Sequence, residues 1–339
     1  MRAPGGVRSV TGFRGRFPAR GWCAAVVAMA VGGIPLMTAA HASAAVPYRV
    51  TRTIPVDFRP SAVAVDPTTR TVYVTNYVGD TVSVINEVTS TVIDNIEVGY
   101  SPDAVAVDPT THTVFVTNEN AGTMSVINEA TRKVTHIIRV GNSPLAVAVD
   151  PVAHTVFVTN VVGGTMSVIN EATSKVTHTI NVGHDPQAVA VDPAAHTAYV
   201  ARTGDGTVSV IDEATSTVTH RIRVGTYPDA VAVDPAAHTV YVASEDGTVS
   251  VIDVATGAVI RTIAMGGILA AVAVDPTART VYVANYFAGT VSVIDEATST
   301  VTATIGVGYG SQSVAVDPDT HSAYVVDFGQ SVSVISRCM

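Results

Sequence analysis

Short runs of alternating apolar and polar residues fill most of the chain from residue 49 onward. The first complete unit holds such runs at residues 62–65 (AVAV), 71–75 (TVYVT) and 81–85 (TVSVI), and then a more polar run at 91–98. A period of two in segments rich in Val, Ile, Thr and Tyr is typical of β-strands. No stretch beyond residue 44 shows a helical period. The pattern therefore predicts an all-β protein with four strands in each unit.

The same unit returns seven times along the chain. The tripeptide Val-Asp-Pro places its aspartate at positions 66, 108, 150, 192, 234, 275 and 317, with spacings of 41 or 42 residues. Four strands in about 42 residues are typical of one propeller blade, and seven blades close a ring. We predict a seven-bladed β-propeller of four-stranded antiparallel blades. The repeats begin near residues 61, 103, 145, 187, 229, 270 and 312.

The two ends of the repeat region complement each other. The seventh unit stops after its third run at residues 331–335, whereas residues 49–56 align with 175–182, an ordinary fourth run. We therefore predict that the N-terminal strand completes the last blade and closes the ring. Pro55 fits the outer edge of a blade, where a strand can lack a backbone donor. Closure would also remove the unpaired edges that promote aggregation of linear arrays.

Residues 1–44 have the composition of an export signal. A basic region reaches Arg20, an apolar run covers residues 22–40, and small residues occupy positions 42–44. A retained membrane anchor is the competing interpretation, but Gly32, Gly33 and Pro35 interrupt the apolar run. We predict a secretory signal peptide over 1–44, cleaved after Ala44 or alternatively after Ala42. The propeller over 45–339 is then secreted, extracellular or cell-wall associated, with no membrane span after signal removal.

The chain is acidic, with 19 Lys and Arg against 28 Asp and Glu and a net charge of −9. Residues 1–44 hold five of the arginines and no acid, so the mature chain has 14 basic against 28 acidic residues, or −14. Such a surface repels phosphates, and we expect no nucleic-acid partner.

Cys23 leaves with the signal, so Cys338 is the one cysteine of the mature chain. We expect a monomer, with a dimer linked through Cys338 as the alternative.

Several recurrent motifs resemble those of a known family. Residues 73–76 spell YVTN, while residues 115–118 and 157–160 read FVTN and residues 282–285 read YVAN. With the recurring Ser-Val-Ile-Asn/Asp and Val-Gly-x-x-Pro, residues 49–336 resemble YVTN-type seven-bladed propellers. They are similar to surface-layer propeller domains and to periplasmic proteins of the YncE type. The resemblance implies the fold but not a function, because propellers host binding modules, lyases, lactonases and dehydrogenases alike.

Residues that recur in most units are expected to serve the blade, whereas departures on loops are free to specialise. Five histidines share the turn after the first strand, namely His112, His154, His196, His238 and His321. Zinc ligands must lie within about 2.0–2.1 Å of one ion, and equivalent turns of a ring point outward from separate blades. We therefore expect these histidines to be exposed turn residues, and we expect no metal and no cofactor.

Candidate ligand-binding residues lie on the loops that enter each first strand, because ligand sites of propellers usually lie at a mouth of the central channel. Five residues before each repeated aspartate the chain holds Ser61, Asp103, Leu145, Gln187, Asp229, Ala270 and Gln312. Arg202 replaces the usual asparagine, and we expect it to pair with Asp185 or Asp205 or to bind an anion. The predicted binding collar comprises Tyr77, Tyr100, Asp103, His184, Asp185, Arg202, Tyr227, Asp229, Tyr286, Phe287, Tyr309 and Gln312.

No local catalytic motif occurs, such as Gly-x-Ser-x-Gly, a phosphate-binding glycine loop, His-Glu-x-x-His or a cysteine beside a base. We expect a non-catalytic binding scaffold that presents its loop-rich face to a protein, glycan or small-molecule ligand. The alternative is a propeller lyase or hydrolase, similar to antibiotic-linearising lyases. In that hypothesis Asp103, Asp229 and His184 converge at the channel mouth.

Overall fold

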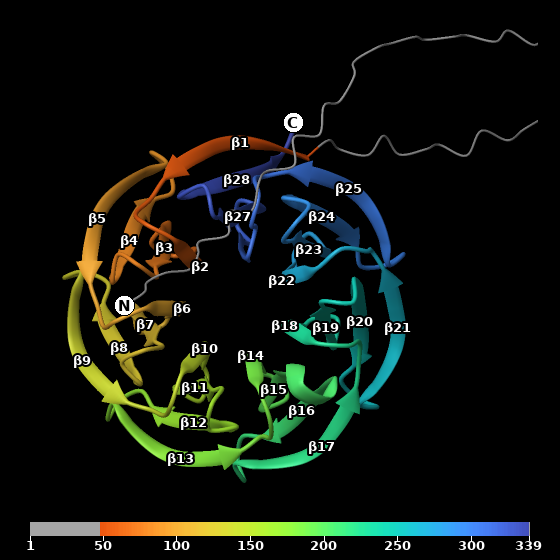
Figure 1. The fold of residues 1–339 in the computed structure, drawn as a ribbon, viewed down its shortest axis with the longest axis horizontal. Helices are drawn as coiled ribbons and strands as arrows, with labels where there is room; N and C mark the ends of the chain where they lie inside the picture. Colours follow the sequence, from red (N-terminus) through yellow and green to blue (C-terminus); the bar gives the residue numbers. More distant parts are fainter. Residues whose placement is uncertain (1–47, 339) are drawn as a thin grey trace, which may run out of the picture. The chain divides into compact units, whose positions relative to one another are not determined.

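A computed structural model describes residues 48–338. The predicted signal peptide, its cleavage site and Cys23 lie outside the described residues. Within them, 28 strands form seven four-stranded sheets, arranged as blades around a central axis (Figure 1). Neighbouring strands of each sheet pair antiparallel, as in the ladder between Thr71–Asn76 and Thr81–Asn86. The predicted seven-bladed propeller of four-stranded antiparallel blades is therefore confirmed.

Each blade contributes one strand to each of four concentric layers. The innermost strands are β2 (Pro60–Asp66), β6 (Pro102–Asp108), β10 (Pro144–Asp150), β14 (Pro186–Asp192), β18 (Pro228–Asp234), β22 (Leu269–Asp275) and β26 (Ser313–Asp317). The second strands are β3 (Thr71–Asn76), β7 (Thr113–Asn118), β11 (Thr155–Asn160), β15 (Thr197–Arg202), β19 (Thr239–Ser244), β23 (Thr280–Asn285) and β27 (Ser322–Asp327). The third strands are β4 (Thr81–Asn86), β8 (Thr123–Asn128), β12 (Thr165–Asn170), β16 (Thr207–Asp212), β20 (Thr248–Asp253), β24 (Thr290–Asp295) and β28 (Ser331–Arg337). The outer strands are β5 (Thr91–Glu97), β9 (Lys133–Arg139), β13 (Lys175–Asn181), β17 (Thr217–Arg223), β21 (Ala258–Ala264), β25 (Thr300–Gly306) and β1 (Tyr48–Pro55).

The hydrophobic core is divided among the seams between neighbouring blades. One cluster joins Tyr73 and Val82 of the first blade to Val114 and Val116 of the second, and all four side chains are at most 1% exposed. Six further clusters of the same kind occur in the described part of the chain. Burying one such side chain contributes about 1.5–3 kcal/mol. The second and third strands are buried on both faces, which explains why they are richer in apolar residues than the outer strands.

Strand β1 closes the ring. It pairs antiparallel with β28, from Tyr48 opposite Arg337 to Pro55 opposite Ser331, and completes the sheet of β26, β27 and β28. Ile54 is 2% exposed and packs in the cluster between the last and first blades. The N-terminal strand therefore completes the last blade as predicted, and Pro55 lies on its outer edge.

Side-chain oxygens hold the turns between strands. One carboxylate oxygen of Asp66 accepts the backbone N–H of Thr68 at 2.8 Å, and the amide oxygen of Asn86 accepts that of Thr89 at 2.9 Å. The one helical element among residues 48–338 is a single 3-10 turn, η1 (Thr203–Asp205). Within the same range, no helix has the length and apolar character needed to cross a membrane.

Candidate functional site

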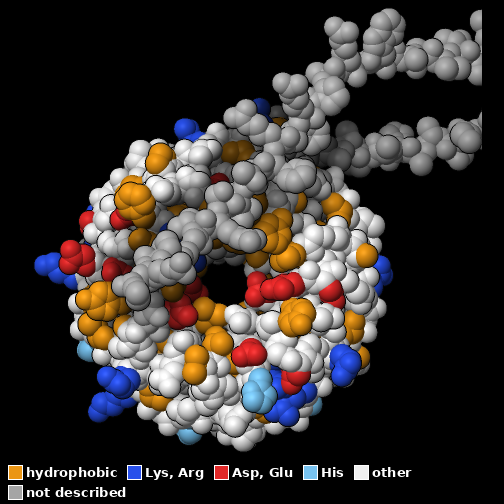
Figure 2. Space-filling model, in the orientation of Figure 1, with side chains coloured by type: hydrophobic (Ala, Val, Ile, Leu, Met, Phe, Trp, Pro, Cys, Tyr) orange, Lys and Arg blue, Asp and Glu red, His pale blue; other side chains and the backbone are white. Residues whose placement is uncertain are grey.

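The loops that enter the inner strands share one face with the loops between second and third strands. Backbone hydrogen bonds join the two sets of loops, from Tyr77 N–H to the Arg59 carbonyl and from Glu119 N–H to the Ser101 carbonyl, each at 2.9 Å. We call this face the mouth face. Figure 2 views the propeller along its axis and shows the central opening, with acidic side chains gathered near it.

A cavity of about 590 Å³ occupies the channel, and all seven blades contribute to its wall. Because each inner strand begins at the mouth face, the residue at the start of each strand points to a shared space. The seven positions five residues before the repeated aspartates all line it, namely Ser61, Asp103, Leu145, Gln187, Asp229, Ala270 and Gln312. The sequence repeat thus located the channel lining correctly, and what this lining binds stays a prediction.

Two carboxyl groups in the cavity have strongly raised pKa values. Burial, helped by nearby Glu119 and Asp229 and opposed by the Arg59 cation, raises the pKa of Asp103 to about 7. Burial likewise raises the pKa of Asp229 to about 7, with Glu245 adding to the effect. The channel wall reduces the contact of both half-buried carboxylates with bulk water, which disfavours their charged forms. Among the described residues that line the cavity, none is Lys, Arg or His.

Aromatic side chains form one side of the mouth, at the sixth and seventh blades. Tyr286 packs edge-on against Phe287 at 5.0 Å and Phe328 at 5.6 Å between ring centroids. Tyr309 lies 6.2 Å from both Tyr286 and Phe287. Tyr286 and Phe287 also line the cavity, and Phe287 is 56% exposed. We call these four side chains the aromatic cluster; Phe328 was absent from the predicted binding collar.

Other members of the predicted collar surround the cavity without lining it. Tyr77 stacks under Arg59 at 4.7 Å and donates a hydrogen bond to Glu119 at 2.7 Å. Five more collar residues outside the lining are exposed, namely Tyr100, His184, Asp185, Tyr227 and Tyr309, whereas Arg202 is buried. The structure therefore brings together Asp103, Asp229, Tyr286, Phe287 and Gln312, and leaves these other side chains around them.

Arg202 is not a surface residue. Its side chain is 4% exposed, pairs with Asp205 at 2.5 Å and donates to the Thr207 hydroxyl at 3.1 Å. It occupies the place of Asn76 in the first blade, whose amide donates to the corresponding Thr81 at 3.0 Å. The expected pairing is thus made with Asp205, and the buried guanidinium is not presented on the mouth face to an anion.

The turn histidines lie at the ends of the strands opposite the mouth face, and three of them each lie close to two carboxylates. His112 Nδ1 lies 3.5 Å from Asp66 Oδ2 of the preceding blade and 3.3 Å from Glu129 Oε2 of its own blade. Two equivalent groups are Asp108, His154 and Glu171, and Asp150, His196 and Glu213. His112 is an exposed turn residue as expected, with its side chain 49% exposed, but the expectation did not include the aspartate of the neighbouring blade, which lies across the seam. The sequence feature that could have indicated this group is the glutamate directly after the third strand, which is Glu129 in the second blade.

Comparisons with known proteins agree with this architecture. The YNCE-like beta-propeller family model matches residues 53–152, and the Cytochrome D1 heme domain model matches residues 198–327. Among solved structures, hydrazine synthase of Kuenenia stuttgartiensis is similar, with a TM-score of 0.73 and 20% sequence identity over 84% of this chain and 97% of that chain. At that identity the likeness concerns the fold alone. No curated protein matched.

The second match raises the question of whether the described channel suits a haem. Haem iron is held by His, Cys, Met or Tyr, and only Tyr286 among the described lining residues is of these types. Asp103, Asp229 and Glu245 would also face the haem propionates without a basic side chain to neutralise them. The lining of this cavity therefore does not fit a haem.

Proposed function

Because this chain is a seven-bladed β-propeller similar to the YNCE-like family, we propose that it is a non-catalytic binding scaffold that takes a cationic ligand with an apolar part at its channel mouth. One observation carries this proposal: three acids and two aromatic side chains line the same cavity, with no basic residue among its described lining. Ligand pockets typically combine apolar walls with a few polar groups that fix orientation.

The acidic and the aromatic parts of the mouth would bind different parts of the ligand. Asp103 and Asp229 supply negative charge inside the channel, where an ion pair is stronger than at an open surface, and the exposed Glu245 adds charge at its rim. Tyr286 and Phe287 offer ring faces to an apolar or cationic group. A ligand such as an arginine-bearing peptide segment matches both halves, and the acidic mature chain would attract it from a distance.

A defined probe tests the proposal. Acetyl-Phe-Arg-amide should bind in isothermal titration at pH 8, while acetyl-Phe-citrulline-amide, which is neutral but of the same shape, should bind at least tenfold more weakly. The double substitution Asp103→Asn and Asp229→Asn should remove this preference. Asp319→Asn, an exposed acid at the opposite end of an inner strand, is the matched control and should preserve it. Equal binding of the two peptides would refute the proposed charge recognition.

The lyase or hydrolase alternative rests on one observation, the pKa of about 7 of both Asp103 and Asp229. Groups that titrate near neutral pH suit proton transfer. His184, the third residue of that hypothesis, is exposed and does not line the cavity. Rapid consumption of an added ligand by the native protein, lost in Asp103→Asn, would favour this alternative.

We also propose that the propeller acts outside the cytoplasm, as the composition of residues 1–44 predicts. N-terminal sequencing of protein recovered from the culture medium or the cell wall tests this. The sequence should begin at Ala45, or at Ser43 if cleavage follows Ala42. Protein found only inside the cell with Met1 retained would contradict export.

A further inference from the structure

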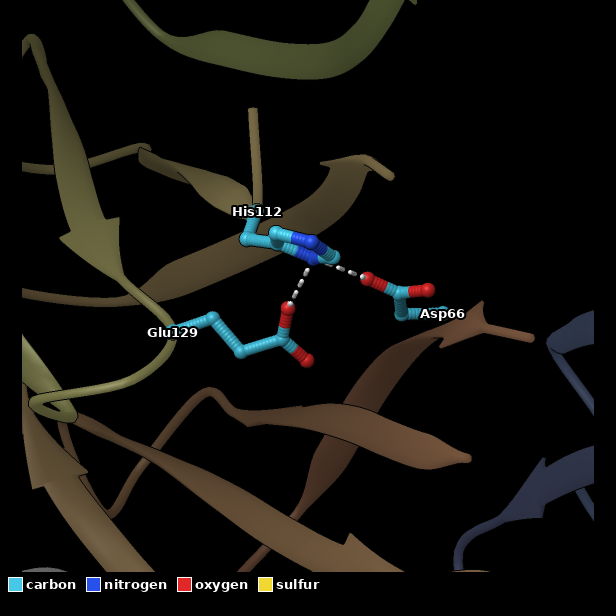
Figure 3. Close-up of side chains that lie close together, drawn as sticks. All are labelled: Asp66, His112 and Glu129. Carbon is cyan, nitrogen blue, oxygen red and sulfur yellow. Dashed lines mark ion pairs between the residues drawn. The ribbon is translucent and has the colours of Figure 1, made fainter. Parts of the chain in front are cut away.

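We propose that the seams between the first four blades carry binding sites for a divalent transition-metal ion such as Zn²⁺, each made by an aspartate of one blade and a histidine and glutamate of the next. The best-formed site comprises Asp66, His112 and Glu129, and Figure 3 shows the His112 ring between the two carboxylates. Asp108, His154 and Glu171 repeat it at the second seam. Asp150, His196 and Glu213 form a wider third copy.

The ligand spacing at the first seam matches a tetrahedral ion. With bonds of about 2.0–2.1 Å, two ligands of tetrahedral zinc lie about 3.3 Å apart. His112 Nδ1 lies 3.3 Å from Glu129 Oε2 and 3.5 Å from Asp66 Oδ2. At the second seam the distances from His154 are 3.6 Å to Glu171 and 3.7 Å to Asp108. These separations exceed the usual distance of about 2.7–3.2 Å in an N–H···O hydrogen bond, and they match the spacing of groups that share one bound ion.

Another seam of the same propeller provides an internal comparison. His321 faces Asp275 there, and the position equivalent to Glu129 is held by Arg337. Without a second carboxylate, His321 Nδ1 approaches Asp275 Oδ2 to 2.8 Å and makes a direct hydrogen bond. A direct hydrogen bond between the histidine and the aspartate is thus found at a seam that lacks the second carboxylate. The His112 side chain is 49% exposed, so a water molecule can reach the site. This water would be the fourth ligand beside the three protein ligands.

Buried carboxylate oxygens provide an independent reason to place a cation at the first seam. Asp66 is fully buried and Glu129 is 8% exposed, yet neither Asp66 Oδ2 nor Glu129 Oε2 receives a hydrogen bond. Both atoms face His112. Leaving two buried carboxylate oxygens without a partner is costly, and a divalent cation would neutralise both charges at once.

The remaining oxygens of both carboxylates are already held in place. Asp66 Oδ1 accepts the hydroxyl of Thr68 at 2.6 Å, and Glu129 Oε1 accepts those of Thr69 at 2.5 Å and Tyr73 at 2.8 Å. Such outer contacts orient metal ligands in known sites. Because Thr69 and Tyr73 belong to the first blade and Glu129 to the second, an ion here would clamp two blades together.

The chain itself suggests the best test substitution. Arg70 and Arg279 occupy the position of His112 in two other blades, so His112→Arg places there a residue that this fold already accepts. Arginine cannot ligate zinc, but it still pairs with carboxylates. His238→Arg is the matched control, because Val254 takes the place of the glutamate at that seam.

The experiment measures zinc stoichiometry of the chelator-treated, dialysed protein by isothermal titration and by elemental analysis after desalting. The native protein should bind Zn²⁺ and unfold at a higher temperature with it. His112→Arg should lose one equivalent, His154→Arg another, and His238→Arg none. A cobalt-substituted native protein should show the visible absorption of tetrahedral Co²⁺, reduced in His112→Arg. A stoichiometry that His112→Arg leaves unchanged, including no binding by either protein, would overturn the proposal.

Discussion

Truncating Ile54 probes the non-covalent closure of the ring. This side chain is 2% exposed and lies on β1, which is joined to the last blade by strand pairing alone. Ile54→Ala leaves a cavity in the cluster shared by the last and first blades, at a cost of about 2–5 kcal/mol in the free energy of unfolding. A domain of about 290 residues unfolds with an entropy of about 0.6 kcal/mol/K, so the unfolding temperature should fall by about 3–8 °C.

A substitution within an ordinary blade gives the comparison. Ile96 occupies the same place on β5 and is 6% exposed. Unlike β1, β5 is covalently continuous with the other strands of its own blade. Ile96→Ala should lower the unfolding temperature by a similar amount in differential scanning calorimetry. Ile260→Ala, at a side chain 55% exposed on β21, should change it by less than about 1 °C. If Ile96→Ala is destabilising and Ile54→Ala is not, the N-terminal strand does not close the ring in solution.

Three further predictions concern the mouth face and the seams. The pKa values of Asp103 and Asp229 are raised in the folded state, so their contribution to stability falls between about pH 4 and pH 7, where the carboxyls of the unfolded chain ionise and those of the folded chain stay protonated. Asp→Asn at either position should therefore raise the unfolding temperature at pH 8 and change it little at pH 4. An equal gain at both pH values would contradict this. Tyr324 donates to Glu87 at 2.7 Å across the closing seam, so Tyr324→Phe should cost about 1–3 kcal/mol in urea unfolding, and an unchanged midpoint would show that the bond adds nothing. Arg202→Ala should lower the unfolding temperature without altering peptide binding measured by titration, since the guanidinium is buried and paired; selective loss of binding would return Arg202 to the ligand site.

Most of the fold and the position of the channel site could be predicted from local sequence. The period of two gave the strands, the spacing of Val-Asp-Pro gave the number of blades, and the unmatched run at residues 49–56 gave the closure. The start of each inner strand then located Asp103, Asp229 and Gln312 in the channel. These features follow from periodicity within one blade, which a repeated sequence displays several times.

Contacts between blades were harder to predict. The meeting of Asp66 with His112 and Glu129 depends on how far one turn reaches across the seam to the next blade. Arg202 was placed in the predicted binding collar, yet the structure keeps it buried in the place of the asparagine of other blades. The aromatic cluster combines Tyr286 and Phe287 with Tyr309 and Phe328 from two separate loops, so its assembly requires the curvature of the ring.

A crystal structure of the protein with acetyl-Phe-Arg-amide, grown at pH 8, is the decisive measurement for ligand binding at the channel mouth. We expect the guanidinium inside the channel cavity against Asp103 or Asp229, with the phenyl ring on Tyr286 or Phe287. A peptide bound at the opposite face or along the outer strands, with the channel mouth free of it, would refute binding at the mouth.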